Sequence, residues 1–521
     1  MKNSLVVFKK NKPRVIKALK DGKISYVADS KWSFADEFYA FCISIGFFNF
    51  AQETYPNPRV RKNIPLWILI ALMLQLKLNQ SSSFLSLPGI LKSGAILTRT
   101  SFNIGTAQGG FNRRNRYPRS EGEIVDHDTL RKYFKDTSAG QLIEWNNGPF
   151  AKFLSSKRAI EKEGIFVLDG THLAVADNEN YELAQYVPLD RHQRYVDVKK
   201  LGPEETKKFK YTLCYKMVNL LHLSKNKDYF TFFGTQISGG AAHDKVLGKA
   251  LVDNFVANIG KGKIKTLIAD RGFLDKDLIT GFKKRYSIDF LIPLKKNMSA
   301  YRDAAGICRL EKKPWEKVDD FTVCYMAKKI ESYGGCIPLN IICIKSTLKN
   351  GKVRLWSLAA TKDYKKASDA VKDYKLRWQI EERYKQIKKS WFAGGFNSTS
   401  FSIICSHTIF ALLVYSLIQV YLNVSSLKRL ANRTIEALKA DEKAGKDCVI
   451  MCAGTYYAVL DPDESLYYVA FLEPEPLDRF RKWITQFRKN KYKRDFLLEK
   501  ILTLKNKFQS KKVVAIYAHF A

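Results

Sequence analysis

The sequence lacks the paired cysteines and histidines that a structural metal site requires. None of its nine cysteines forms a C-x-x-C pair, and neither His172 nor His243 has a second His or Cys at ligand spacing. We therefore interpret the cysteines, Cys448 and Cys452 included, as reduced core residues. The two histidines are interpreted as structural.

Long hydrophobic runs are also scarce. The first twenty residues hold only a three-residue apolar run between charges, so we expect no secretory signal and a cytoplasmic protein. Residues 64–74 are too short to cross a bilayer, and residues 401–424 are interrupted by polar side chains such as His407 and Gln419. We interpret both stretches as buried helices.

Acidic residues are few relative to basic ones. The chain of 521 residues has 88 Lys plus Arg against 51 Asp plus Glu, a formal net charge of +37. Such an excess favours a polyanion as partner, because each phosphate that a protein neutralises releases counterions. Composition alone leaves a ribosome-associated or merely basic protein open.

Apolar periodicity predicts an α/β protein with helical ends. Residues 1–158 are predicted to be mainly helical and are a candidate for DNA-end binding. Residues 159–296 predict three strands, a helix, a strand, a helix and a strand, an order typical of a mixed sheet covered by helices.

The second half of the chain departs from this alternation. Residues 297–362 contain three strand-like segments that we interpret as a β insertion, and residues 363–425 return to helices. For residues 426–521 we expect helices, a hairpin over 455–471 and a basic tail from Arg479.

Two aspartates stand where predicted strands end. Asp169 closes the apolar run IFVLD and Asp270 closes IKTLIAD, and glycine follows each within two positions. In open α/β sheets, binding sites collect at the carboxyl ends of strands. Each aspartate taken alone also fits a structural role, because Asp favours turns.

A charged helix predicted from Asp373 to Lys389 has a more specific pattern. On a continuous helix Tyr374, Arg377, Glu381 and Lys388 share one face about 60° wide. A solvated helix with an Arg377–Glu381 ion pair would show the same pattern.

Three carboxylates suit the chemistry of a basic protein. Carboxylate oxygens are preferred ligands of Mg²⁺, which retains water and substrate phosphate as further ligands. Two such ions about 3.5 to 4 Å apart can activate the attacking oxygen and stabilise the leaving oxygen in phosphodiester displacement. We expect two divalent ions, Mg²⁺ or Mn²⁺, at Asp169, Asp270 and Glu381.

The motifs DGTHL, DRGF and Y-x2-R-x3-E-x6-K together resemble the DDE transposases of a large bacterial insertion-sequence family defined by the Y-R-E-K motif. The resemblance covers roughly residues 160–425. It implies an RNase H-like fold with a β insertion before the helix that carries the glutamate. It also implies double-stranded DNA as partner, both as element ends and as target, a homodimer on DNA, and association with the bacterial nucleoid.

The resemblance also implies roles for individual residues. Asp169, Asp270 and Glu381 would be the catalytic, metal-binding triad. Tyr374, Arg377 and Lys388 would contact phosphates of the cleaved DNA end. A tryptophan of the insertion, either Trp315 or Trp356, would stabilise a flipped base, although a core position fits either residue.

The sequence predicts cut-and-paste transposition, in which an element end is cleaved and its 3′-hydroxyl attacks DNA. Two alternatives stay open. An RNase H-like nuclease or resolvase would cut without joining, and a non-enzymatic relic would only bind DNA. The Y-R-E-K pattern favours the transposase over the nuclease, and the presence of all three acids argues against the relic.

Overall fold

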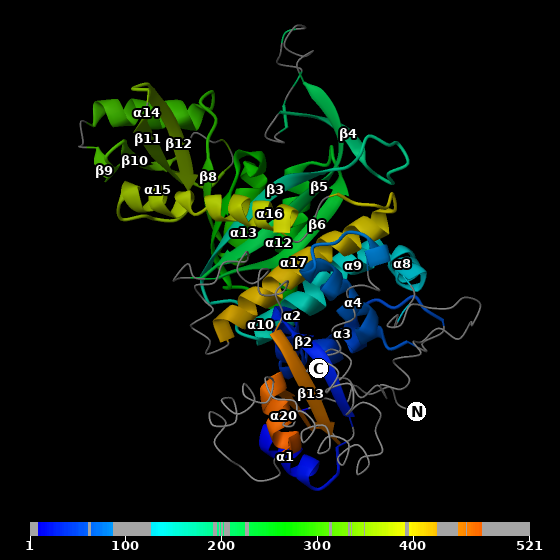
Figure 1. Ribbon diagram of the computed structural model, residues 1–521. Coiled ribbons are helices and arrows are strands. Elements are labelled where there is room, and N and C mark those ends of the chain that lie inside the picture. Colours follow the sequence, from blue (N-terminus) through cyan, green and yellow to red (C-terminus); the bar gives the residue numbers. More distant parts are fainter. Residues whose placement is uncertain are drawn as a thin grey trace.

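The computed structural model describes residues 9–470 with gaps at 25, 61–63, 87–124, 126, 191–194, 197, 199–201, 203–208, 225–228, 312–314, 332–333, 335, 349, 391–394, 425–445 and 455. The predicted basic tail from Arg479 lies outside these residues. The described part contains a long mixed sheet covered by helices and a second, smaller sheet (Figure 1). The predicted α/β class is therefore confirmed.

The central part of the long sheet has the strand order β6-β5-β3-β7-β8. Strand β5 runs antiparallel to β3 and β6, whereas β7 runs parallel to both β3 and β8. A further strand, β4, pairs with the first residues of β5. The bounds are β3 Gly164–Ala174, β4 Gln185–Leu189, β5 Lys210–Leu223, β6 Phe230–Gly239, β7 Ile264–Ala269 and β8 Asp289–Pro293.

Side chains protect the outer edge of strand β6. The amide of Asn147 accepts from Thr235 N and donates to Thr235 O, both at 2.8 Å. Ser416 and Gln419 accept from the backbone N–H groups of Phe232 and Phe230. These bonds satisfy edge groups that could otherwise pair with another strand.

Helices cover the central strands on both faces. Helix α12 (Asp244–Ile259) packs on β5 and β6 and touches α13 (Lys276–Tyr286). Helix α16 (Trp378–Ser390) packs on β3 and on α17 (Phe401–Val424), which runs along β6. A short 3₁₀ turn, η4 (Arg271–Phe273), follows β7.

The predicted β insertion extends the central sheet. Its strand β12 pairs antiparallel with β8, and the order continues β12-β11-β10-β9. The three predicted strands are present as β10, β11 and β12, whereas α14 and β9 were not predicted. The bounds are α14 Ser299–Leu310, β9 Glu316–Asp319, β10 Thr322–Ile330, β11 Leu339–Thr347, β12 Val353–Ala360 and, after the insertion, α15 Ala367–Lys375.

Helices from the N-terminal region surround α17. They are α2 Phe34–Ser44, α3 Phe47–Thr54, α4 Leu66–Leu78, α8 His127–Asp136, α9 Ala139–Trp145 and α10 Ala151–Ser156, with the short turns η1 Phe84–Ser86 and η2 Asn146–Phe150. Among the described residues, Phe401–Asn423 is the only segment long and apolar enough to cross a bilayer, and 89% of its most apolar stretch is buried inside the protein. The prediction that both apolar stretches form buried helices is confirmed.

The two ends of the described chain build the small sheet, of order β1-β14-β13-β2, at the opposite end of the molecule from the insertion (Figure 1). Its elements are β1 Lys9–Lys10, α1 Lys12–Lys20, β2 Tyr26–Trp32, β13 Lys446–Ala453, β14 Tyr456–Leu460 and α20 Pro462–Ala470. The region 1–158, predicted to be helical, thus also contributes two strands.

The hairpin predicted over 455–471 is wrong, because only its first half is a strand. Strand β14 pairs with the preceding strand β13. After β14, Asp461 Oδ1 accepts a hydrogen bond of 2.8 Å from Glu464 N, and Pro462 begins helix α20. An acidic cap followed by proline is a helix start.

Candidate active site

Strands β3 and β7 bring the two aspartates side by side. Their parallel register ends with Leu168 opposite Ala269, and Asp169 and Asp270 are the next residues on each chain. Two residues separated by about 100 positions in sequence therefore meet where the parallel pairing of β3 with β7 ends. The prediction that Asp169 ends its strand is wrong, because β3 continues to Ala174 and stays paired with β5. Asp169 is 7% exposed, whereas Asp270 faces solvent.

The environment of Asp169 disfavours its charged form. Burial raises the pKa of Asp169 to about 7, while the Arg377 guanidinium opposes this shift and the negative charges of Asp270 and Glu381 add to it. The three carboxylates are thus close enough to repel one another.

The predicted continuous helix from Asp373 to Lys389 is wrong. Helix α15 ends at Lys375 and α16 begins at Trp378. In the break, Leu376 N bonds to Asp373 O and Arg377 N bonds to Tyr374 O, each at 3.0 Å. These i to i+3 bonds tighten the turn, so Tyr374 and Arg377 precede the helix that carries Glu381 and Lys388.

Arg377 links two of the acids. Its Nη1 lies 3.2 Å from Asp169 Oδ2, and its Nη2 donates to Glu381 Oε1. Arg377 lies beside Tyr374, and burial raises the pKa of the Tyr374 hydroxyl above its ordinary value. The four residues form one connected group beside the middle of β3.

Two further residues of α16 hold the helix on strand β3. Lys388 Nζ donates to Thr171 Oγ1 at 2.8 Å and to His172 O at 2.7 Å, and burial lowers its pKa to about 8. The hydroxyl of Tyr384 donates to Asp169 O at 2.7 Å. Lys388 therefore contacts protein atoms on the strand, next to the acids.

The two candidate tryptophans occupy different places. The ring of Trp356 lies 5.9 Å from the ring of Tyr374, and its Nε1 donates to Ser346. Trp315 is 40% exposed and lies beside Tyr325 within the insertion. Only Trp356 adjoins the group formed by Tyr374, Arg377 and the acids.

Some residues around the site were not predicted from the sequence. They are Tyr384, Asn219, Lys216 and Asp244. Asn219 donates to the Tyr384 hydroxyl, and Lys216 pairs with Asp244 at 2.8 Å. Apart from the position of Asp244 at a predicted helix start, no sequence signal points to them. His243 acts as a structural helix cap, its Nδ1 accepting from Lys245 N.

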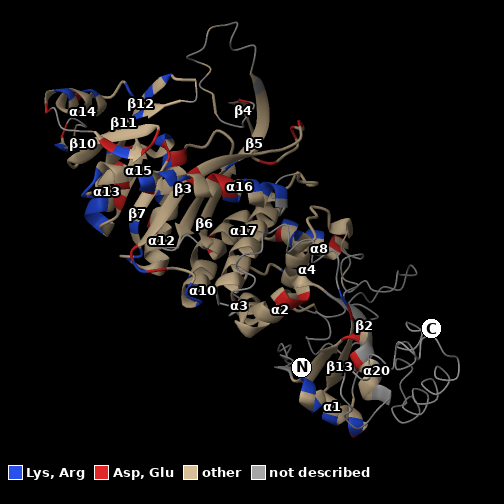
Figure 2. Cartoon of the chain, turned by 60° about the vertical axis from the view of Figure 1, so that its left-hand side comes forward, with Lys and Arg blue, Asp and Glu red and all other residues tan. Residues whose placement is uncertain are grey.

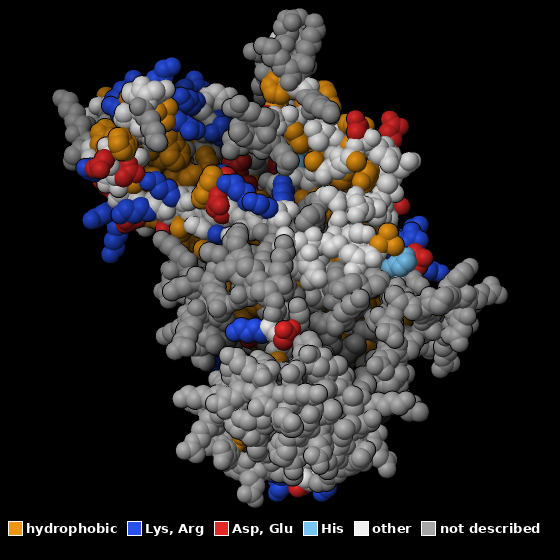
Figure 3. Space-filling model, in the orientation of Figure 1, with side chains coloured by type: hydrophobic (Ala, Val, Ile, Leu, Met, Phe, Trp, Pro, Cys, Tyr) orange, Lys and Arg blue, Asp and Glu red, His pale blue; other side chains and the backbone are white. Residues whose placement is uncertain are grey.

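The surface around the site is hollowed and mixed in charge. Acidic side chains lie in a hollow between the insertion and the central sheet, bordered by Lys and Arg (Figure 3). Lys and Arg residues also gather on α13, whose last turn contains Lys283, Lys284 and Arg285 (Figure 2). Positive charge thus borders the acids in the hollow, whereas the last turn of α13 lies at the opposite end of β7, near Lys261.

The three carboxylates are chemically suitable ligands for a hard divalent cation. Three carboxylates supply only oxygen ligands, and the raised pKa of Asp169 indicates a carboxylate in need of a counter-charge. Among the described residues, no three His, Cys, Asp or Glu side chains are spaced to hold one ion. The Arg377 guanidinium lies between Asp169 and Glu381 and supplies that charge.

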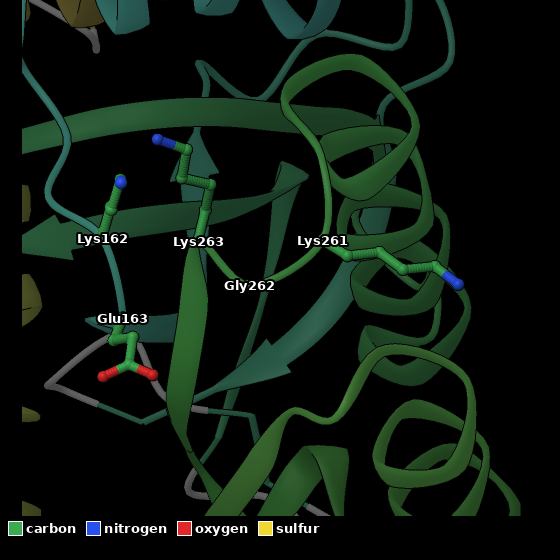
Figure 4. Close-up of a pocket in the computed structure, with 5 residues that line it drawn as sticks. All are labelled: Lys162, Glu163, Lys261, Gly262 and Lys263. Atoms are coloured by element: carbon green, nitrogen blue, oxygen red, sulfur yellow. The ribbon is translucent and has the colours of Figure 1, made fainter.

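A separate cavity lies at the other end of the same strands. Its volume is about 390 Å³, and it is lined by Lys162, Glu163, Lys261, Gly262 and Lys263. In Figure 4 these residues lie where β7 begins, and the Lys261 side chain points away from those of Lys162 and Lys263. None of the predicted site residues lines this cavity.

Comparison with known proteins agrees with this geometry. Residues 160–417 match the family model of the transposase DDE domain. This part of the chain is therefore similar to transposase DDE domains, and its mixed sheet with flanking helices is consistent with the RNase H-like architecture expected from the resemblance. No curated protein matches the chain.

Proposed function

We propose that this DDE transposase cleaves the ends of an insertion sequence and joins them to target DNA by a cut-and-paste mechanism. The observation that carries the proposal is the convergence of Asp169, Asp270 and Glu381. Asp169 comes from β3, Asp270 directly follows β7 and Glu381 comes from α16, and the three acids meet where the parallel pairing of β3 with β7 ends. In a protein of net charge +37, an acidic cluster with a buried member fits catalysis on a polyanion better than binding alone.

In this proposal Asp169, Asp270 and Glu381 hold two divalent ions, Mg²⁺ or Mn²⁺. When bound, such ions activate the attacking oxygen and stabilise the leaving oxygen of a phosphodiester. The role of the protein is to fix three carboxylates on rigid elements. Arg377 neutralises Asp169 and Glu381 before DNA binds, and transfer of its guanidinium to a DNA phosphate would leave both carboxylates available.

The remaining motif residues would orient the DNA. Tyr374 and Lys388 flank the acids, and Trp356 lies against Tyr374, so a phosphate and an unstacked base could be held at neighbouring points. Trp315 lies within the insertion, apart from this group. We further propose a homodimer on double-stranded DNA and a cytoplasmic, nucleoid-associated location.

The test is strand cleavage and joining on labelled DNA that carries the ends flanking the gene, with Mg²⁺. Glu381→Gln is compared with Glu382→Gln, a matched control whose carboxylate pairs with Lys385 instead of Arg377. We expect nicked and joined products from wild type and from the control, and neither from Glu381→Gln.

The other outcomes are equally informative. Nicking without joining by the wild type would point to a nuclease or resolvase. DNA binding without nicking would point to an inactive relic. If Glu381→Gln matched wild type and Glu382→Gln did not, the third acid would be Glu382.

A further inference from the structure

Helices α16 and α12 lie on opposite faces of the sheet beside the aspartates. Asn219 of β5 contacts Tyr384 of α16, whereas Lys216 of the same strand contacts Asp244 of α12. Residues an odd number of positions apart on a strand point to opposite faces. Asp244 therefore lies behind the acids, on the face away from Glu381, and is not placed to share a metal ion with them.

The carboxylate of Asp244 occupies space that a side chain would need beside both aspartates, at Gly170 of strand β3 and at Gly272 of the turn η4. A Cβ on Gly170 would overlap Asp244 Oδ1 and would lie 2.9 Å from Lys216 Cε. A Cβ on Gly272 would lie 3.3 Å from Asp244 Oδ2. Neither glycine has a left-handed φ, so both positions require the absence of a side chain rather than an unusual backbone.

The next turn of α12 contacts the same two segments. A Cβ added to Gly248 would, at its ideal position, lie 2.6 Å from Phe273 Cε1 and 3.0 Å from Leu168 Cδ2. Leu168 immediately precedes Asp169, and Phe273 follows Asp270 by three positions. The first two turns of α12 thus pack against residues on both sides of Asp169 and against residues that follow Asp270.

An ion pair fixes the beginning of α12 in this position. Lys216 Nζ lies 2.8 Å from Asp244 Oδ1, and the Lys216 side chain is 8% exposed. Asp244 stands in the first turn of α12, where an acid is stabilised by the helix dipole. Removing one member of a buried pair leaves the other charge uncompensated, so the pair resists displacement.

We propose that the Lys216–Asp244 pair is a positioning device for the transposition reaction, holding strand β3 at Asp169 and the turn after Asp270 in register from behind. The inference rests on the proposed function for its catalytic consequence. Its structural content, a single carboxylate packed between Gly170 of the strand and Gly272 of the turn, can be tested separately. Asp244 and Lys216 act through the backbone of these two segments and do not touch the reacting atoms.

The first test is hydrogen exchange of the full chain, which needs neither metal nor activity. In Asp244→Asn we expect severalfold faster exchange in segments 168–174 and 269–274, because the strand and the turn lose their common support. The control is Lys249→Met, which breaks an exposed pair one turn further along α12. Faster exchange confined to α12 itself would show a merely helical role and overturn the proposal.

The second test is a double-mutant cycle on thermal unfolding. Gly170→Ala should lower the melting temperature in wild type and lower it much less in Asp244→Gly, because the overlapping carboxylate is gone. If Gly170→Ala lowered the melting temperature equally in wild type and in Asp244→Gly, the inferred steric contact between position 170 and Asp244 would be overturned.

The third test is end cleavage at saturating DNA. Asp244→Asn should lower the turnover rate by about 100-fold with unchanged half-saturating DNA, since small displacements of catalytic groups are costly. An unaltered rate would overturn the catalytic role. A wild type that cleaves no DNA would instead refute the proposed function. Hydrogen exchange and the double-mutant cycle would still decide whether the Lys216–Asp244 pair holds strand β3 and the turn after Asp270.

Discussion

The two ends of the parallel pairing of β3 with β7 hold charge in different ways. At the end that bears the aspartates, Asp169 is buried and shares Arg377 with Glu381. At the other end, Lys162 and Lys261 are exposed and line an open cavity (Figure 4). Charge is abundant at both ends, but Asp169 is buried and paired, whereas the two lysines are exposed.

This difference shows which charged residues constrain the positions of their neighbours. An exposed lysine is solvated and contributes little to the position of its neighbours. A buried carboxylate next to two others must be compensated, so its neighbours are held at definite positions. Mutations at the two ends should therefore have unequal effects, and the following predictions compare them.

The largest effect is expected for Asp169→Asn. The amide has nearly the shape of the carboxylate but no negative charge, so cleavage should fall about a thousandfold or more. Lys263→Met at the opposite end of the strand pair should cleave within a few-fold of wild type. Single-turnover cleavage measures both variants, and normal cleavage by Asp169→Asn would remove this residue from the triad.

A smaller loss is expected for Arg377→Met. Its two guanidinium nitrogens contact Asp169 and Glu381, so the substitution leaves two partly buried carboxylates uncompensated. Breaking such a pair costs about 3 kcal/mol in stability. The cost should be larger at pH 8 than at pH 6, because without Arg377 the pKa of Asp169 rises further above 7 and the carboxyl is neutral at the lower pH.

Urea unfolding at the two pH values measures this cost, and Arg377→Lys is the companion variant. A single ammonium cannot bridge both carboxylates in the planar geometry of a guanidinium, so Lys should restore only part of the stability. Equal stability of Arg377→Met and wild type at pH 8 would show that the two contacts are not stabilising.

The sequence predicts where β3 and β7 begin because each starts as an apolar run, and it predicts the end of β7 at Asp270 but not the continuation of β3 beyond Asp169. It does not predict the break at Leu376, because the helical periodicity of the polar residues continues across it. The tight turn is visible only in the hydrogen bonds of Leu376 and Arg377. A reader of one sequence therefore places Glu381 on a helix but assigns Tyr374 to the same helix, whereas the structure separates the two.

Contacts between distant segments are the other part that the sequence could not supply. Asn219 and Tyr384 are separated by 165 positions, and neither belongs to a motif. The small sheet combines β1 and β2 with β13 and β14 from the far end of the chain. Local patterns predict elements, whereas such pairings depend on the folded arrangement of the whole chain.

A moderate effect is expected for Tyr384→Phe. The hydroxyl donates to Asp169 O, and its loss leaves that buried carbonyl without this donor, which costs about 1 to 2 kcal/mol. The matched control is Tyr39→Phe, because Tyr39 donates a bond of the same length, 2.7 Å, to Ala71 O in the N-terminal helices. Both variants should lose similar stability in urea unfolding, but only Tyr384→Phe should also cleave more slowly. Equal cleavage by the two would mean that Tyr384 has no role in positioning Asp169.

The last effect concerns the pH dependence of stability and distinguishes the two ends of the pairing of β3 with β7. His222 pairs with Phe166 near the amino end of the strand, and burial lowers its pKa to about 4. A base with a lowered pKa in the fold contributes stability that is present above about pH 6.5 and is lost as the pH falls towards 4. The pH dependence of stability due to Asp169 has the opposite sign. Because the pKa of Asp169 is raised in the fold, its contribution to stability falls as the pH rises towards 7.

Wild type should therefore lose about 2 kcal/mol more than His222→Phe between pH 7.5 and pH 5, since one pKa unit corresponds to about 1.4 kcal/mol. Urea unfolding of both proteins at the two pH values isolates this contribution, because all other titrating groups are shared. Asp169→Asn should still lose the stability that depends on neutral His222 when the pH falls. The contributions of His222 and Asp169 to the pH dependence of stability can thus be separated. The same loss in wild type and His222→Phe would mean that the imidazole is already charged in the fold, in conflict with its burial between Phe166 and Phe233.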